Sequence, residues 1–148
     1  MPTTLGTEYP TNWKGTPPHM LREDVPVWQR FQGKYSVLWK KLYLDVLVGG
    51  PFLSAEEEKD NMKRMWRYNN SKRLDALAVL ENGVWIIEVT ASPGLRALGQ
   101  LLTYVSLWQD DDPLSLIETP VLVCETLDTD LISSAAKFGI VTYLLPSP

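Results

Sequence analysis

The chain has 148 residues, of which 45% are apolar and 22% are charged, and its formal net charge at pH 7 is -4. This is the composition of an ordinary globular protein, and the length is sufficient for one domain with a sizeable core. Neither a membrane span nor a secretion signal is expected, because there is no apolar run of about 20 residues and no basic start followed by an apolar segment. The acidic balance argues against a general nucleic-acid coat, although it leaves room for a local basic face.

Two residue types limit the chemistry further. Cys124 is the one cysteine, which excludes an internal disulfide and a multi-cysteine zinc site and fits a reducing, cytoplasmic environment. His19 is the one histidine, so a histidine-based triad or a histidine-rich metal site is not expected.

Residues 1–25 are rich in Pro, Thr and Gly and predict an extended, irregular arm. We expect this arm to be held either by its own domain or by a neighbouring subunit. Residues 26–148 then form a single α/β domain.

The first half of that domain predicts helix, strand and helix. Apolar residues recur every three to four positions from Trp28 to Leu42, which favours a helix, and residues 42–48 alternate as in a strand. Ser54 and Glu57 form a capping-box pattern, which predicts one helix that continues to Asn70.

The second half predicts a strand pair, then helix, strand, helix and strand. Asn82-Gly83 is a two-residue hairpin signal between strands at 73–80 and 84–90. Ser92 and Pro93 predict the start of a helix whose apolar face is Leu95, Leu98, Leu102, Val105 and Trp108. Residues 119–145 follow as strand, helix and strand, so the order predicts a mixed β-sheet with a central hairpin, flanked by helices.

Two carboxylates share one face of the predicted hairpin. With Asn82-Gly83 as the loop, Asp75 lies opposite Thr90, and Glu88 is its diagonal neighbour on the same face. Two carboxylates at that spacing can chelate one hard cation, Mg²⁺ or Mn²⁺, with water filling the other positions. The competing interpretation is that both acids are edge or surface residues, as most strand acids are.

The stretch "RLDALAVLENGVWIIEVTA" followed by "LGQLLTY" resembles the core of the PD-(D/E)XK nuclease superfamily, which has a restriction-endonuclease-like fold. The resemblance covers residues 73–104 and implies that Asp75, Glu88 and the backbone carbonyl of Val89 are metal ligands. Gln100 and Tyr104 resemble the Gln-x-x-x-Tyr motif of RecB-like members and share one helix face. Alternatively, Tyr104 packs in the core and Gln100 lies at a polar edge.

The resemblance breaks at Thr90, which occupies the position of the family's lysine. A relocated cation would have to replace it, and the candidates are Lys72, Arg73 and Arg96. The competing interpretation of Arg96 is a solvated helix residue.

A basic stripe recurs every four residues at Lys59, Lys63 and Arg67 and could contact DNA phosphates. We favour the alternative that these residues complement the helix dipole and that Asp60 pairs with Arg64, four residues further on. We also expect Trp66 and Met62 to be core residues rather than a base-stacking surface.

Two functions follow. The favoured one is a nuclease-like domain without catalytic activity, used for assembly through its arm or for binding near DNA, as in a phage structural component of the virion. The alternative is a Mg²⁺- or Mn²⁺-dependent DNA nuclease with a relocated cation.

Overall fold

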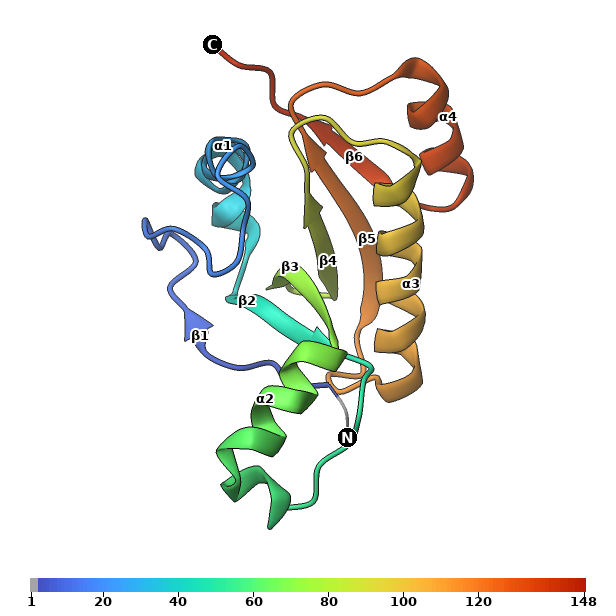
Figure 1. The fold of residues 1–148 in the computed structure, drawn as a ribbon. Helices are drawn as coiled ribbons and strands as arrows, with labels where there is room; N and C mark the ends of the chain where they lie inside the picture. Colours follow the sequence, from blue (N-terminus) through green and yellow to red (C-terminus); the bar gives the residue numbers. More distant parts are fainter. Residues whose placement is uncertain (1–2) are drawn as a thin grey trace.

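The computed structural model describes residues 3–148 and contains one six-stranded mixed sheet with helices on both faces (Figure 1). The predicted fold class, a mixed α/β sheet with a central hairpin and flanking helices, is confirmed. The elements in chain order are β1 (Glu8–Tyr9), α1 (Val25–Tyr35), η1 (Ser36–Leu38), β2 (Lys41–Val48), η2 (Glu57–Lys59), α2 (Asn61–Asn70), β3 (Lys72–Val79), β4 (Gly83–Val89), α3 (Leu95–Asp111), β5 (Ile117–Cys124), α4 (Thr129–Lys137) and β6 (Val141–Leu144).

The strands lie in chain order, β1-β2-β3-β4-β5-β6. Each neighbouring pair from β1 to β4 is antiparallel, whereas β4, β5 and β6 are parallel because α3 and α4 connect them. The β3–β4 hairpin is therefore central, as predicted. Its two faces are buried against different helices: α3 and α4 cover one face, and α1 covers the other (Figure 1).

The N-terminal arm packs on its own chain. β1 pairs with β2, Thr4 forms an isolated bridge to Leu47, and the Gln32 side chain donates a hydrogen bond to the Thr11 carbonyl at 3.0 Å. These contacts add β1 to one edge of the sheet as a strand that the sequence did not predict. They favour the interpretation that the arm is held by its own domain.

The predicted helix from Ser54 to Asn70 is divided in two. The capping box forms, with Ser54 and Glu57 exchanging hydrogen bonds at 3.1 and 3.2 Å, but it caps only the short turn η2. Asp60 then adopts an extended backbone with ψ 115°, and its carboxylate accepts from the Met62 and Lys63 amides as the N-cap of α2. A second, stronger cap within the segment thus restarts the helix.

Helix α3 begins later than the sequence predicted. Ser92 and Pro93 lie outside it, and Gly94 occupies the N-cap position. Leu95 is consequently 78% exposed in the first turn, where it was expected to be buried. The buried stripe is Ala97, Leu98, Leu101, Tyr104 and Trp108.

The hairpin register differs from the predicted one by two residues. Val79 pairs with Val84, and the Leu80 amide bonds to the Gly83 carbonyl at 2.8 Å, so Glu81 and Asn82 form the loop. Gly83 belongs to the strand because β5 approaches it closely. A Cβ there would lie 2.8 Å from the Ile117 carbonyl oxygen.

Candidate metal centre and cavity

Asp75 and Glu88 lie side by side at the centre of the sheet. A shift of two residues preserves the face of every side chain, so the prediction that they share a face is confirmed. The observed register places Asp75 opposite Glu88, where the sequence had placed it opposite Thr90. The two carboxyl groups are close enough for each to influence the pKa of the other, and Asp75 Oδ2 accepts a hydrogen bond from the Val89 amide at 2.8 Å.

Burial raises the pKa of both carboxyl groups. Glu88 is only 8% exposed, and burial, the Asp75 carboxylate and the Asp24 carboxylate all raise its pKa. The pKa of Asp75 is raised by burial and by Asp24 and Asp45, against the opposing hydrogen bond from Val89. The pair therefore holds a shared proton in the absence of a cation.

Asp24 is a site residue that the sequence analysis missed. It occupies the N-cap position of α1, yet its carboxylate makes no cap hydrogen bond and instead accepts the Ala91 amide at 2.8 Å. This bond joins the start of α1 to the segment after β4 and directs a negative charge toward Glu88. The signal in the sequence was an acid directly before Val25-Pro26, a helix-start pattern.

Asp45 marks a break in β2 beside the acid pair. Its φ is +54°, a left-handed conformation inside a strand. Leu44 packs in the core beneath α1, whereas Val46 packs in the core beneath α3, so the strand changes faces at this residue. The Tyr68 hydroxyl donates to Asp45 at 2.8 Å, and His19 Nε2 lies 3.7 Å from the same oxygen. Backbone strain of this kind is often retained at functional sites.

Two cavities share Lys72 and Tyr104, and the smaller of them is lined by Asp75. One, of about 250 Å³, is lined by Pro18, His19, Asp45, Ser71, Lys72, Arg73, Asp75 and Tyr104. The other, of about 640 Å³, is lined by Lys72, Arg96, Gly99, Gln100, Thr103 and Tyr104.

The structure places the predicted Gln100–Tyr104 face at this site. Tyr104 is buried and Gln100 is half-buried on α3. Burial raises the pKa of Tyr104 to about 12, helped by the Glu88 and Asp75 carboxylates and opposed by Arg73 and Arg96.

Thr90 supplies no charge to this arrangement. It follows β4, is half-buried, and its amide bonds to the Val123 carbonyl at 2.9 Å. Of the three candidates for a relocated cation, Arg73 lines the smaller cavity, Arg96 lines the larger one, and Lys72 lines both. The structure therefore brings positive charge to the site from the start of β3 and the first turn of α3.

The predicted basic stripe is not a continuous helix face. Lys59 belongs to η2, Lys63 pairs with Glu57 at 3.2 Å, and Arg67 is buried. The stripe was expected because one helix was expected over 54–70, and the Asp60 cap interrupts it. The alternative, an Asp60–Arg64 pair, is also replaced, since Arg64 bonds to Asn61.

The oxygen atoms at this site supply some, but not all, of the ligands that a hard divalent cation requires. Asp75 and Glu88 provide carboxylate oxygens, the ligands that Mg²⁺ and Mn²⁺ prefer. Within residues 3–148, no group of three or more His, Cys, Asp or Glu side chains is arranged to hold a metal ion. A cation here would thus depend on two carboxylates, backbone oxygen and water.

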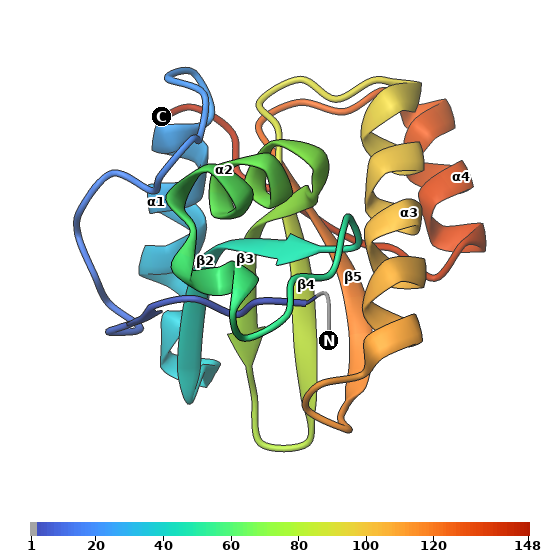
Figure 2. The ribbon, with the colours of Figure 1, turned by 60° about the horizontal axis from the view of Figure 1, so that its bottom comes forward.

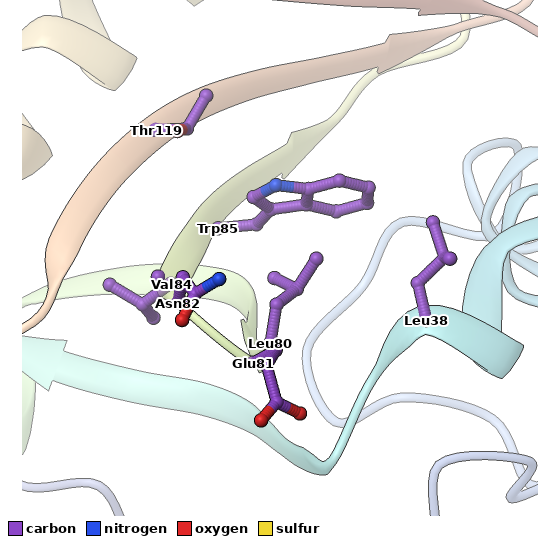
Figure 3. A pocket seen from close by; sticks show the side chains of 8 residues that line it. Leu38, Leu80, Glu81, Asn82, Val84, Trp85 and Thr119 are labelled. Carbon is purple, nitrogen blue, oxygen red and sulfur yellow. The ribbon is translucent and has the colours of Figure 1, made fainter.

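A further cavity, of about 370 Å³, lies at the hairpin tip, at the opposite end of β4 from Glu88. Figure 3 shows the Trp85 indole pointing toward Leu38, with Leu80 beneath it. Its one carboxylate, Glu81, pairs with Lys40. This cavity is apolar and separate from the acid pair.

No protein-family model matches the chain, and no curated protein matches it. A similar solved structure is described as a repair endonuclease from Pyrococcus abyssi, with a TM-score of 0.43 and 16% sequence identity. The match covers 68% of this chain and 50% of the neighbour, so the chain spans about half of that protein's length. A likeness at this level assigns no activity. Among residues 3–148, no helix is long and apolar enough to cross a membrane.

Proposed function

We propose that this domain is a Mg²⁺- or Mn²⁺-dependent DNA nuclease with Asp75 and Glu88 as its metal ligands. The observation that carries the proposal is the register of β3 and β4, which sets the half-buried Asp75 opposite the buried Glu88, with the carboxylates of Asp24 and Asp45 near enough to raise the pKa of Asp75. Like charges held together in a buried site favour either a shared proton or a divalent cation. The adjoining cavities, lined by three basic residues, suit a phosphate-bearing substrate.

The side chains would divide the work as follows. Asp75 and Glu88 hold the cation, and the Val89 amide keeps the Asp75 carboxylate oriented. When bound, the cation supplies activation of water and stabilisation of charge on a phosphate. Lys72 and Arg96 provide the positive charge that Thr90 lacks at the family's lysine position, and they do so from the wall of the larger cavity.

A nuclease-like domain without activity is the second candidate. Thr90 favours it, because an alcohol at the lysine position neither carries charge nor acts as a base at neutral pH. In this alternative the acid pair remains protonated, and the domain serves in assembly or in binding near DNA, with a phage particle as one setting. An assembly role for residues 1–25 would have to use surface that remains available after the arm has packed on β2.

The experiment is a cleavage assay on purified full-length protein with labelled single- and double-stranded DNA, in Mn²⁺, in Mg²⁺ and in EDTA. We expect metal-dependent cleavage that falls by about 100-fold or more in Asp75→Asn, the scale of losing one transition-state charge stabiliser. Glu81→Gln, at the exposed hairpin tip, is the matched control and should cleave normally. Circular dichroism checks that both variants fold.

Calorimetric titration with Mn²⁺ separates the two candidates when cleavage is absent. Binding by wild type that disappears in Asp75→Asn would keep the metal centre. Absence of both cleavage and binding would contradict the proposal and support the non-catalytic domain.

A further inference from the structure

Helix α2 presents an apolar face to solvent. Met62, Met65 and Trp66 are 82%, 66% and 54% exposed, although Trp66 and Met62 were predicted to be core residues. Their spacing of three and four residues places them on one side of the helix. Trp66 is exposed, whereas each of the other five tryptophans is buried or half-buried.

The end of α2 that follows this face lies beside the site, although the contact is made by Tyr68 on another side of the helix. The Tyr68 hydroxyl bonds to Asp45, and the Arg73 guanidinium lies 4.7 Å from the centre of the Tyr68 ring. By chain length, Trp66 lies at most about 23 Å from Asp75, since four helical steps to Asn70 and five extended steps after it separate them. Figures 1 and 2 show α2 at the edge of the molecule, on the side of β2 and β3 and away from α4.

The charge along this path is positive in an otherwise acidic chain. Residues 61–73 contain five basic residues and no acidic one, whereas the remainder of the chain has nine basic and eighteen acidic residues. Four of the five, namely Lys63, Arg64, Lys72 and Arg73, are exposed, and only Arg67 is buried. The acidic residues from Glu56 to Asp60 precede the helix, so they lie at its end away from the site.

We propose that the Met62–Met65–Trp66 face is a stacking surface for single-stranded DNA, which leads the strand to the Asp75–Glu88 site. The inference rests on the proposed nuclease function and specifies its substrate. Unpaired bases stack on aromatic side chains while basic residues follow the phosphates, and the combination is sequence-tolerant. A duplex does not offer an unstacked base to Trp66. The core of a protein–protein interface is depleted of charge, whereas cations flank this face on the side toward the site.

The test measures binding in EDTA, so that hydrolysis plays no part. A fluorescein-labelled 12-nucleotide oligo-dT is titrated with full-length protein and followed by anisotropy. Trp66→Ala should weaken binding by about 5-fold to 100-fold, the range for loss of one base–aromatic contact. Trp66→Phe should restore much of it, because a phenyl ring also stacks. Phe138→Ala, an exposed aromatic at the end of α4, is the matched control and should bind as wild type does.

Salt dependence tests the phosphate path separately. Arg64→Gln should reduce the slope of log affinity against log salt by about 0.7, as expected for one lost contact to a single strand. Unchanged binding in Trp66→Ala, or equal affinity for a 12-base-pair duplex, would overturn the proposal. Concentration-dependent self-association that Trp66→Ala abolishes, without an effect on DNA binding, would instead assign the face to a protein contact and also overturn it.

The outcomes keep this proposal distinct from the nuclease proposal. Asp75→Asn should bind oligo-dT as tightly as wild type does while it fails to cleave. If wild type binds through Trp66 but never cleaves, the stacking surface is supported and the nuclease function is contradicted. If wild type cleaves in an Asp75-dependent way and Trp66→Ala binds normally, the nuclease function is supported and the stacking surface is contradicted.

Discussion

Replacing Glu88 by Gln should stabilise the protein at alkaline pH in the absence of divalent cations. Gln has nearly the same shape, can donate a hydrogen bond to Asp75, and carries no charge to bury. The folded state raises the pKa of Glu88 from 4.5 to about 9, so it binds a proton more tightly than the unfolded chain does. The stability from this proton is fully present below pH 4.5 and is lost as pH rises toward 9.

The size of the effect follows from the linkage between pKa and stability. Part of the rise in the pKa of Glu88 from 4.5 to about 9 comes from the Asp75 and Asp24 carboxylates and is coupled to their protonation. We therefore count a difference of about two, less than half of that rise, which corresponds to about 2.7 kcal/mol. For a chain of this length, that is a rise in Tm of about 8 °C. We expect Glu88→Gln to show this gain at pH 8 and almost none at pH 4.5, where wild type keeps the proton.

The assay is thermal unfolding by circular dichroism from pH 4.5 to 9 in EDTA, with Glu81→Gln as the exposed control. In the same scan with Mg²⁺ or Mn²⁺, wild type should have the higher Tm. A cation at 100 times its Kd stabilises wild type by about 2.7 kcal/mol and Glu88→Gln by much less. A Tm for Glu88→Gln that equals or falls below that of wild type at pH 8 in EDTA would refute the shared-proton reasoning.

Three further predictions concern packing and charge. Arg30→Ala should lower the free energy of unfolding, measured by denaturant titration, by about 2–3 kcal/mol. Three hydrogen bonds from this guanidinium join α1 to Glu125 and to the chain after β6. On α3, replacing the buried Leu101 by Ala should lower the free energy of unfolding by about 2–5 kcal/mol. Leu95→Ala, at an exposed position of the same helix, should lower it by less than about 0.5 kcal/mol. Arg96→Gln should slow cleavage without changing the Kd for Mn²⁺ in calorimetry; an equal loss of both would contradict its place at the substrate.

The hairpin shows how far local patterns reach. The alternation of side chains has a period of two, so any register that differs by two residues keeps Asp75 and Glu88 on one face. The loop itself could not be placed from the Asn82-Gly83 signal, because Gly83 is required by the approach of β5, a strand more than 30 residues further on. The position of the loop is therefore set by the contact between Gly83 and β5 and not by the local preference of Asn82-Gly83 for a turn.

The helices show the same limit. Both the Ser54–Glu57 box and the Asp60 cap are readable in the sequence, but their competition is decided by the path of the chain. Trp66 looked like a core residue because it is large and aromatic, and it is exposed because α2 makes few contacts with the sheet.

By itself, the sequence determined the mixed α/β class, the central hairpin, the shared face of Asp75 and Glu88, and the helix that carries Gln100 and Tyr104. Periodicity and turn chemistry are properties of neighbouring residues, so they can be read without the fold. Only the tertiary structure decided that Asp24 and Asp45 lie near the acid pair and that Lys72, Arg73 and Arg96 line the neighbouring cavities. Those residues come from separate elements, and their proximity depends on how α1, β2 and α3 pack on the sheet.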